Sequence, residues 1–193
     1  MTPRETKRLT SRIADIKRIF ATEKLCYGCY YDKSGVRYLP TKYYMQLGDY
    51  TGGLSYLKWF SKNFPDDRGL PYFLFEWTII LFKKGNTKKA EKKAFETFCS
   101  NTYLFDTFFG RSVTPIDKWE SSNLENAAFS KHLGYSSCQI ELSDFSEWLK
   151  KYMLTEKFIK LSAKYIDIQK QLKTETDPEV RNDLVMQARQ LQK

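Results

Sequence analysis

Two cysteines separated by two residues, Cys26 and Cys29, have the spacing in this chain that most directly suggests chemistry. Two thiolates on one turn can share a tetrahedral zinc ion, but a structural zinc site needs two further ligands. The other candidates are Cys99, Cys138 and the single histidine, His132, and all are distant in sequence. A complete site would have to combine separate segments, for example Cys26, Cys29, His132 and Cys138. One CxxC without a second pair favours ordinary reduced thiols, so we expect no metal and no cofactor.

The titratable residues offer little for catalysis. A single histidine excludes a histidine-based metal centre or a pair of histidines, and leaves only a Ser or Cys nucleophile working with His132. The densest group of carboxylates is Asp117, Glu120 and Glu125, which we place in first helical turns, where capping is the usual role of such residues. The glycines in residues 48–53 match neither the Walker nor the dinucleotide-binding pattern. The sequence therefore predicts a protein that is not an enzyme.

Lysines recur at helical spacing between residues 83 and 93. With 32 basic and 23 acidic residues, the chain carries a net charge of +9, which is compatible with binding nucleic-acid phosphates. A solvated helix face produces the same pattern, and the neighbouring aromatic residues occupy core-facing positions instead of base-stacking ones. Nucleic-acid binding is therefore kept as an alternative function. The lysines of this stripe are Lys83, Lys84, Lys88, Lys89, Lys92 and Lys93.

The charge is distributed unevenly along the chain. Residues 1–25 contain seven basic and three acidic residues, a net charge of +4. Residues 105–147 contain three basic and seven acidic residues, a net charge of −4. This polarity indicates a scaffold with distinct faces.

The first element expected to position these residues is an amphipathic helix over residues 4–22. Leu9, Ile13, Ile16 and Phe20 follow one another at intervals of four, three and four, which is the spacing of one buried helix face. The tyrosines and the glycine turn in residues 30–38 predict a small β-hairpin, with an irregular loop as the alternative.

An internal repeat follows. Gly48 and Gly85 are 37 residues apart, and so are Gly53 and Ala90. In each copy the glycine ends one helix in a left-handed conformation, and the small residue lets the next helix pack closely against the first. The spacing therefore predicts two helix hairpins within residues 38–101, each of which must stack on neighbours to bury its apolar face.

The remaining segments also read as helices. Residues 72–82 are apolar nearly all round but contain Glu76 and are about half as long as a membrane span, which favours a buried core helix. Residues 143–193 carry helical spacing, with Asp177 and Pro178 as a cap and first-turn proline, and predict C-terminal capping helices. Because the N-terminus lacks the features of a signal peptide, we expect a cytoplasmic protein that does not enter a membrane.

Residues 38–101 resemble the tetratricopeptide repeat, a helix hairpin with a glycine turn, a small residue opening its second helix and a closing proline. More loosely, the whole chain resembles small bacterial repeat-like proteins without an assigned activity. The resemblance implies one all-α domain over residues 1–193, built from stacked antiparallel helix hairpins as in an α-solenoid. The matching positions are Gly48, Gly53, Leu57 and Pro65 in the first copy and Gly85, Ala90 and Ala94 in the second.

The resemblance also implies a function, namely a protein–protein interaction scaffold that binds a peptide or helix of another protein in its groove. The groove would be lined by the first helix of each hairpin. For Tyr72, Phe75 and Ile79, burial in the core is the competing interpretation, because their helix is apolar nearly all round. The residues expected to line the groove are Tyr38, Lys42, Met45, Tyr72, Phe75, Ile79 and Lys83.

Overall fold

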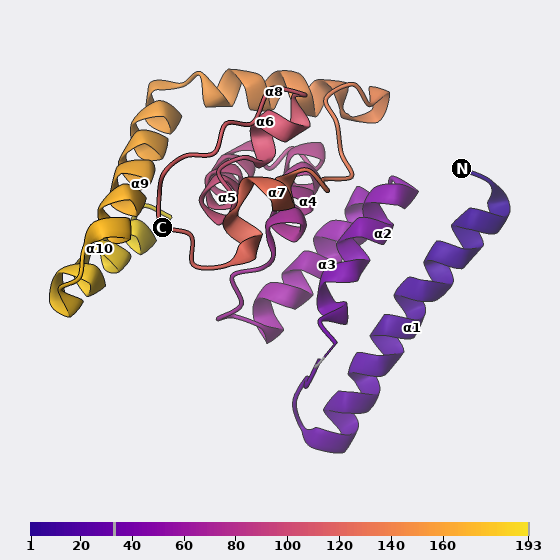
Figure 1. Ribbon diagram of the computed structural model, residues 1–193. Helices are drawn as coiled ribbons and strands as arrows, with labels where there is room; N and C mark the ends of the chain where they lie inside the picture. The colour runs from indigo at the N-terminus through magenta and orange to yellow at the C-terminus, as the bar shows by residue number, and fades with distance from the viewer. Residues whose placement is uncertain (33, 193) are drawn as a thin grey trace. The chain divides into compact units, whose positions relative to one another are not determined.

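The chain is described by a computed structural model that covers residues 1–32 and 34–192 (Figure 1). These residues form ten α-helices and three short 3-10 helices and contain no β-strand. The predicted all-α class is therefore confirmed.

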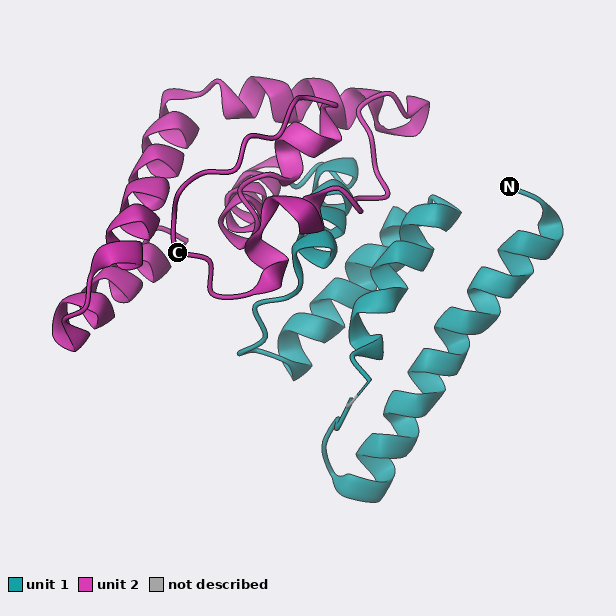
Figure 2. Cartoon of the chain, viewed as in Figure 1, with its two compact units in different colours: residues 1–86 teal, residues 87–193 magenta. Residues whose placement is uncertain are grey.

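The chain divides into two compact units, residues 1–86 and residues 87–193, which are coloured separately in Figure 2. The expectation of a single domain over residues 1–193 stays a prediction.

The longest helix of unit 1 is α1 (Pro3–Tyr27), and its boundaries follow from its sequence. Thr2 and Glu5 form a capping box at its N-terminus, and it ends where Gly28 takes a left-handed conformation with φ of 69°. Its buried residues are the four that the spacing predicted, Leu9, Ile13, Ile16 and Phe20. This buried face packs against α2 (Leu39–Leu47).

The β-hairpin expected over residues 30–38 is wrong, because residues 30–32 and 34–38 include no strand and the segment ends in a 3-10 helix, η1 (Val36–Tyr38). The carboxylate of Asp32 accepts hydrogen bonds from the backbone N–H groups of Val36 (2.8 Å) and Arg37 (3.1 Å). These bonds, with Gly35 at φ of 66°, close the turn locally and compete with strand pairing. Lys33, within the predicted hairpin, lies outside the described residues.

The first predicted helix hairpin is present as α2 and α3 (Tyr50–Asn63). Gly48 ends α2 with φ of 67°, and the Asp49 carboxylate caps α3 by accepting from the Gly52 N–H at 2.8 Å. A Cβ atom at Gly53 would lie 2.9 Å from Cδ1 of Ile80 and 3.3 Å from Cβ of Tyr44. Glycine at position 53 therefore lets α2, α3 and α4 (Pro71–Lys83) meet closely.

These three helices and α1 enclose the core of unit 1. On α4, Glu76 is buried and accepts a hydrogen bond from the Thr41 hydroxyl on α2 at 2.5 Å, so the carboxylate does not enter the core unsatisfied. Among the described residues, none of the helices has both the length and the apolar character that a membrane crossing requires. The core cluster comprises Ile13, Tyr44, Tyr56, Leu57, Phe60, Phe73 and Ile80.

Unit 2 begins with α5, whose packing follows the predicted face. Ala90 and Ala94 are fully buried, and α5 packs against α9. The Tyr165 hydroxyl on α9 donates to the Cys99 carbonyl on α5 at 2.7 Å. The α-helices of this unit are α5 (Thr87–Ser100), α6 (Leu104–Phe108), α7 (Ala127–Ser130), α8 (Ser143–Met153), α9 (Glu156–Thr174) and α10 (Pro178–Gln190), with 3-10 helices η2 (Asn123–Glu125) and η3 (Ile140–Leu142).

The C-terminal helices α9 and α10 pack against each other. Asp177 caps α10 by accepting from the N–H groups of Glu179 and Val180, and Pro178 occupies its first turn. The guanidinium of Arg181 donates to the carbonyls of Leu172 and Glu175, which ties the start of α10 to the end of α9. The hairpin is therefore held by polar contacts at its turn as well as by its apolar faces.

Candidate functional site

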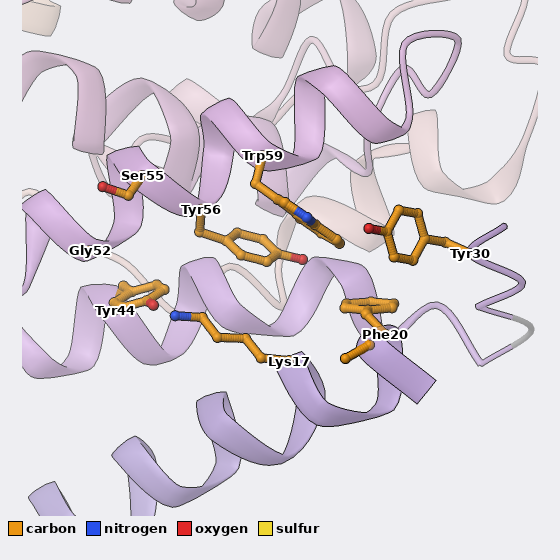
Figure 3. Close-up of a pocket in the computed structure, with 9 residues that line it drawn as sticks. Lys17, Phe20, Tyr30, Tyr44, Gly52, Ser55, Tyr56 and Trp59 are labelled. Atoms are coloured by element: carbon orange, nitrogen blue, oxygen red, sulfur yellow. The ribbon is translucent and has the colours of Figure 1, made fainter. Parts of the chain in front are cut away.

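A pocket of about 380 Å³ lies in unit 1, among α1, α2 and α3 (Figure 3). Its volume is at the lower end of the range of small-ligand sites, and large enough for one or two side chains of a partner. Five of its lining residues are aromatic. The pocket is lined by Lys17, Phe20, Ala21, Tyr30, Tyr44, Gly52, Ser55, Tyr56 and Trp59.

Helical spacing puts these residues on facing walls. On α1, Lys17 lies one turn before Phe20 and Ala21. Phe20 belongs to the buried stripe, and Lys17 and Ala21 lie beside it. On α3, positions 52, 55, 56 and 59 repeat at intervals of three and four and share one face. Tyr44 comes from α2, and Tyr30 follows the end of α1. Figure 3 shows the Lys17 and Phe20 side chains on the α1 side and Tyr56 and Trp59 on the α3 side.

The aromatic wall is centred on Trp59. Its ring centroid lies 5.1 Å from that of Phe20, 5.2 Å from Tyr30 and 5.4 Å from Tyr56. Rings at these separations contact one another, so they support each other's orientation. The wall is thereby preorganised for an apolar group that packs against it.

The Tyr56 hydroxyl is an internal anchor of this wall. It donates to the Arg37 carbonyl at 2.7 Å, and burial raises the pKa of Tyr56 well above its usual range. The hydroxyl therefore remains a protonated donor that holds the ring in place. Its role in the pocket is structural.

Glycine is required at position 52 in the pocket lining. A Cβ atom there would lie 2.3 Å from Oδ2 of Asp49 and 2.5 Å from Cε1 of Tyr44. Real Cβ atoms do not approach other atoms this closely, so a larger residue would displace either the α3 cap or the tyrosine ring. Glycine thus preserves both the cap and the shape of the pocket.

The charged group in the pocket lining is the ammonium of Lys17. Its Nζ lies 5.9 Å from the centroid of the Tyr44 ring, and the side chain is exposed. A second ammonium, that of Lys24, lies 5.5 Å from the centroid of the Tyr30 ring. The nine described lining residues include no carboxylate. The pocket therefore combines an apolar wall with a positive rim.

The residues expected to line a groove lie elsewhere. Of the nine described residues around the pocket, none belongs to the predicted set. Lys42 is exposed on α2, Met45 and Tyr72 are partly exposed, and Lys83 lies over the Tyr50 ring at 5.8 Å. Phe75 and Ile79 have no exposed surface, so the structure places them in the core.

Tyr38, the remaining member of the predicted set, takes part in a polar cluster. Its hydroxyl donates to the Asp67 carboxylate at 2.7 Å, and Asp67 also accepts from Nε of Arg37 at 2.5 Å. The same guanidinium pairs with the buried carboxylate of Asp32 at 2.8 Å. Burial and the neighbouring Asp67 carboxylate raise the pKa of Tyr38 to about 12. This cluster ties η1 to the segment that follows α3.

The lysine stripe is divided between the two units. Lys83 and Lys84 belong to unit 1, where the ammonium of Lys84 donates to the Thr51 hydroxyl at 3.0 Å. The other four lie on α5 in unit 2, where Lys93 pairs with Glu96. Lys88, Lys89 and Lys92 are exposed.

The structure does not bring the candidate metal ligands together in one site. Cys26, Cys29 and Cys138 are exposed and Cys99 is buried. Within residues 1–32 and 34–192, no three side chains of His, Cys, Asp or Glu lie together in a way that could hold a metal ion. His132 is exposed just after α7, and its backbone N–H donates to the Phe129 carbonyl at 3.2 Å.

The three candidate carboxylates have separate partners in unit 2. Asp117 pairs with Lys173. Glu120 accepts from the ammonium of Lys118 at 3.1 Å, and Glu125, in η2, accepts from the Ser121 N–H at 3.0 Å.

Sequence reasoning missed the pocket residues as a set. Phe20 was expected to be buried on one face of α1, but nothing indicated that it meets Trp59. The available signal is the occurrence of Lys17, Phe20 and Ala21 on one flank of α1. That signal becomes informative only when α3 is known to be the neighbour.

Comparison with known proteins gives one family match. A family model described as effector-associated domain 9 matches residues 145–193, about a quarter of the chain. The matched segment contains most of α8 and all of α9 and α10. A search of curated proteins and a search of solved structures each found no match. The tetratricopeptide resemblance thus stays a prediction.

Proposed function

We propose that this chain is a non-catalytic interaction scaffold that binds a peptide or helix of a partner protein in the aromatic pocket of unit 1. The observation that carries the proposal is the preorganised wall around Trp59, which borders a pocket of about 380 Å³. Aromatic walls with a few polar groups are typical of sites that receive an apolar side chain. A partner helix commonly binds in this way, by laying its apolar face into a groove between helices.

The helix hairpin supports this architecture. We propose that α2 and α3 form one tetratricopeptide-like unit, with Gly48 at its turn and Gly53 at the helix crossing. The corresponding positions of the second hairpin are Gly85 and Ala90. Hairpins of this kind present binding surfaces between stacked helices, and α1 would then act as the neighbour that completes the site.

The family match supports a role in association. The matched model describes a domain by its association with effectors, and we propose that this chain likewise associates with an effector protein. The matched residues 145–193 belong to unit 2, whereas the pocket belongs to unit 1. The two units would therefore contribute separate contacts.

Filling the pocket tests the proposal. Ser55 is exposed on α3, lines the pocket, and donates to the carbonyl four residues earlier. Ser61 is an exposed serine on the same helix with the same type of hydrogen bond, but it does not line the pocket. Ser55→Trp should occupy the pocket, while Ser61→Trp adds the same side chain elsewhere on α3.

The measurement is affinity capture with the full chain from its native host, quantified by mass spectrometry. We expect a protein that is retained by the wild type and by Ser61→Trp but lost with Ser55→Trp. Equal capture of every protein by all three forms would show that the pocket is not the binding site. Circular dichroism of both variants confirms that the helices are intact.

A further inference from the structure

We propose that the pocket of unit 1 receives an acidic apolar pair, meaning a large apolar side chain next to an internal Asp or Glu of the partner chain. This inference rests on the proposed function, because it specifies what the same pocket binds. It follows from the charges and the shape of the lining residues. It also excludes two other ligand chemistries that an aromatic pocket could serve.

The charge of the site favours an anionic group. The ammonium of Lys17 lies at the pocket, while its nine described lining residues include no carboxylate. The acidic groups next to the lining are already engaged. Asp49 accepts from the Gly52 N–H, Glu23 accepts from the N–H groups of Tyr31 and Asp32, and the Asp32 carboxylate pairs with Arg37. The surrounding sequence has the same sign, since residues 1–25 carry a net charge of +4. A partner segment with acidic residues is therefore complementary in charge to the Lys17 side of the pocket.

The apolar part of the pair is set by the ring arrangement. Phe20, Tyr30 and Trp59 contact one another, so their faces and edges form a continuous wall. A large apolar side chain buries its surface against such a wall and gains most of its binding free energy from that burial. The neighbouring carboxylate then lies at the Lys17 end.

A cationic ligand does not fit this site. Aromatic cages for cations need ring faces that surround an open space. Here the ring centroids of Phe20 and Trp59 are only 5.1 Å apart, and Lys17 already places a positive charge beside the rings. A second cation would be repelled by that ammonium.

An internal carboxylate fits better than a chain terminus. Lys17 is a single point charge on a flexible stem, and it does not impose the fixed, multidentate geometry that orients a terminal carboxylate. The Ser55 hydroxyl is engaged with the Thr51 carbonyl at 3.0 Å. The Lys17 ammonium therefore favours a negatively charged residue of the partner, and the aromatic wall favours a large apolar side chain beside it.

Three N-acetylated dipeptides test the inference on the full-length protein. Acetyl-Glu-Phe-amide carries the internal acid, acetyl-Gln-Phe-amide lacks it, and acetyl-Gln-Phe with a free carboxylate carries a terminal one. Binding is followed from the ¹H–¹⁵N NMR shifts of the amides of Ala21, Gly52 and Ser55. We expect the glutamyl peptide to bind about two- to five-fold more tightly than the glutaminyl amide, as for a solvent-exposed ion pair.

Lys17 variants assign this preference to a residue. Lys17→Met should reduce the glutamyl preference to about one-fold, because the ion pair that produces it is removed, and Lys17→Arg should retain it. Lys7→Met is the matched control: Lys7 is exposed on the same helix, about 15 Å from Lys17 along the axis. This control should leave the preference unchanged.

The possible failures are distinct. If none of the dipeptides shifts the pocket amides, the pocket does not bind apolar side chains and the proposed function fails with the inference. If the glutamyl and glutaminyl amides bind equally, or the preference survives Lys17→Met, only the inference is overturned. Tighter binding of the peptide with the free carboxylate would assign the site to a chain terminus.

Discussion

Gly53 on α3 and Ile80 on α4 meet so closely that a Cβ atom at position 53 would lie 2.9 Å from Cδ1 of the isoleucine. Both residues are buried, and the same Cβ would lie 3.3 Å from Cβ of Tyr44 on α2. Three helices of unit 1 thus converge on one glycine. Their separation depends on the absence of a side chain there.

This contact predicts the effect of overpacking. Gly53→Leu should lower the free energy of unfolding by about 1–3 kcal/mol, because the added side chain has to displace Ile80 or Tyr44. Urea denaturation followed by circular dichroism, compared at unchanged slope, measures the difference.

Exposed lysines on the same helices provide the controls. Lys58→Leu on α3 should change the free energy by no more than about 0.5 kcal/mol, since Lys58 is exposed. In unit 2, Ala90→Leu and Lys89→Leu form the corresponding buried and exposed pair. Neutral substitutions at Gly53 and Ala90 together with destabilising ones at the lysines would show that the helical register is incorrect.

The Tyr38 cluster predicts a dependence of stability on alkaline pH. The pKa of Tyr38 is raised to about 12 in the folded protein, whereas a tyrosine in an unfolded chain ionises near pH 10. The folded state therefore favours the protonated phenol. Its contribution to stability is fully present below about pH 10 and is lost as the pH rises through about 12.

Comparison of the wild type with Tyr38→Phe isolates this effect from the other tyrosines. The free energy of unfolding should decrease less steeply between about pH 10 and 12 in the variant, because phenylalanine has no proton to lose. Urea denaturation at several pH values provides the measurement. Parallel curves for the two proteins over this range would contradict the assigned pKa shift.

The thiols should differ in reactivity. Cys26, Cys29 and Cys138 are exposed, so they should react rapidly with Ellman's reagent in the native protein. Cys99 is buried, and burial raises the pKa of its thiol, so it should react only when unit 2 opens. The expected result is three rapid thiols and a fourth released by denaturant. Protection of Cys26 and Cys29 that a chelator removes would instead indicate a bound metal.

Nucleic-acid binding gives a separate prediction for α5. Lys93 is paired with Glu96, and Phe95 and Phe98 are buried, so α5 lacks aromatic platforms for stacking bases between its lysines. We expect the wild type to pass through DNA and RNA columns without retention at about 50 mM salt. Retention that declines steeply with salt and disappears when Lys88, Lys89, Lys92 and Lys93 are changed to Glu would establish the alternative function.

Local sequence determined most of the helix boundaries. The capping box of Thr2 and Glu5, the glycine turn at position 48 and the cap at Asp177 each act within a few residues of the group they satisfy. Short-range interactions of this kind can be read from spacing alone. The same holds for the buried face of α1, since every member of it lies within one or two turns of the next.

In residues 30–38, residue types alone predicted the wrong secondary structure, although the interactions that decide it are short-range. The tyrosines and Val36 on either side of the glycine turn favour strands, but one side chain, Asp32, satisfies two backbone N–H groups and pairs with Arg37. Strand propensity is a weak preference of roughly 1 kcal/mol, so a few specific hydrogen bonds outweigh it. The last three residues, Val36–Tyr38, consequently form a 3-10 helix.

Which residues line the pocket depends on the tertiary structure alone. Periodicity indicates which residues of α1 and α3 face inward, but apolar burial is not directional and does not specify which helix a face will meet. The packing of α1 on α2 brings Lys17 and Phe20 of α1 together with Tyr56 and Trp59 of α3 around one pocket of about 380 Å³. The sequence by itself therefore determined an all-α chain with its capped helices, whereas the pocket depends on contacts between residues up to 42 positions apart, from 17 to 59.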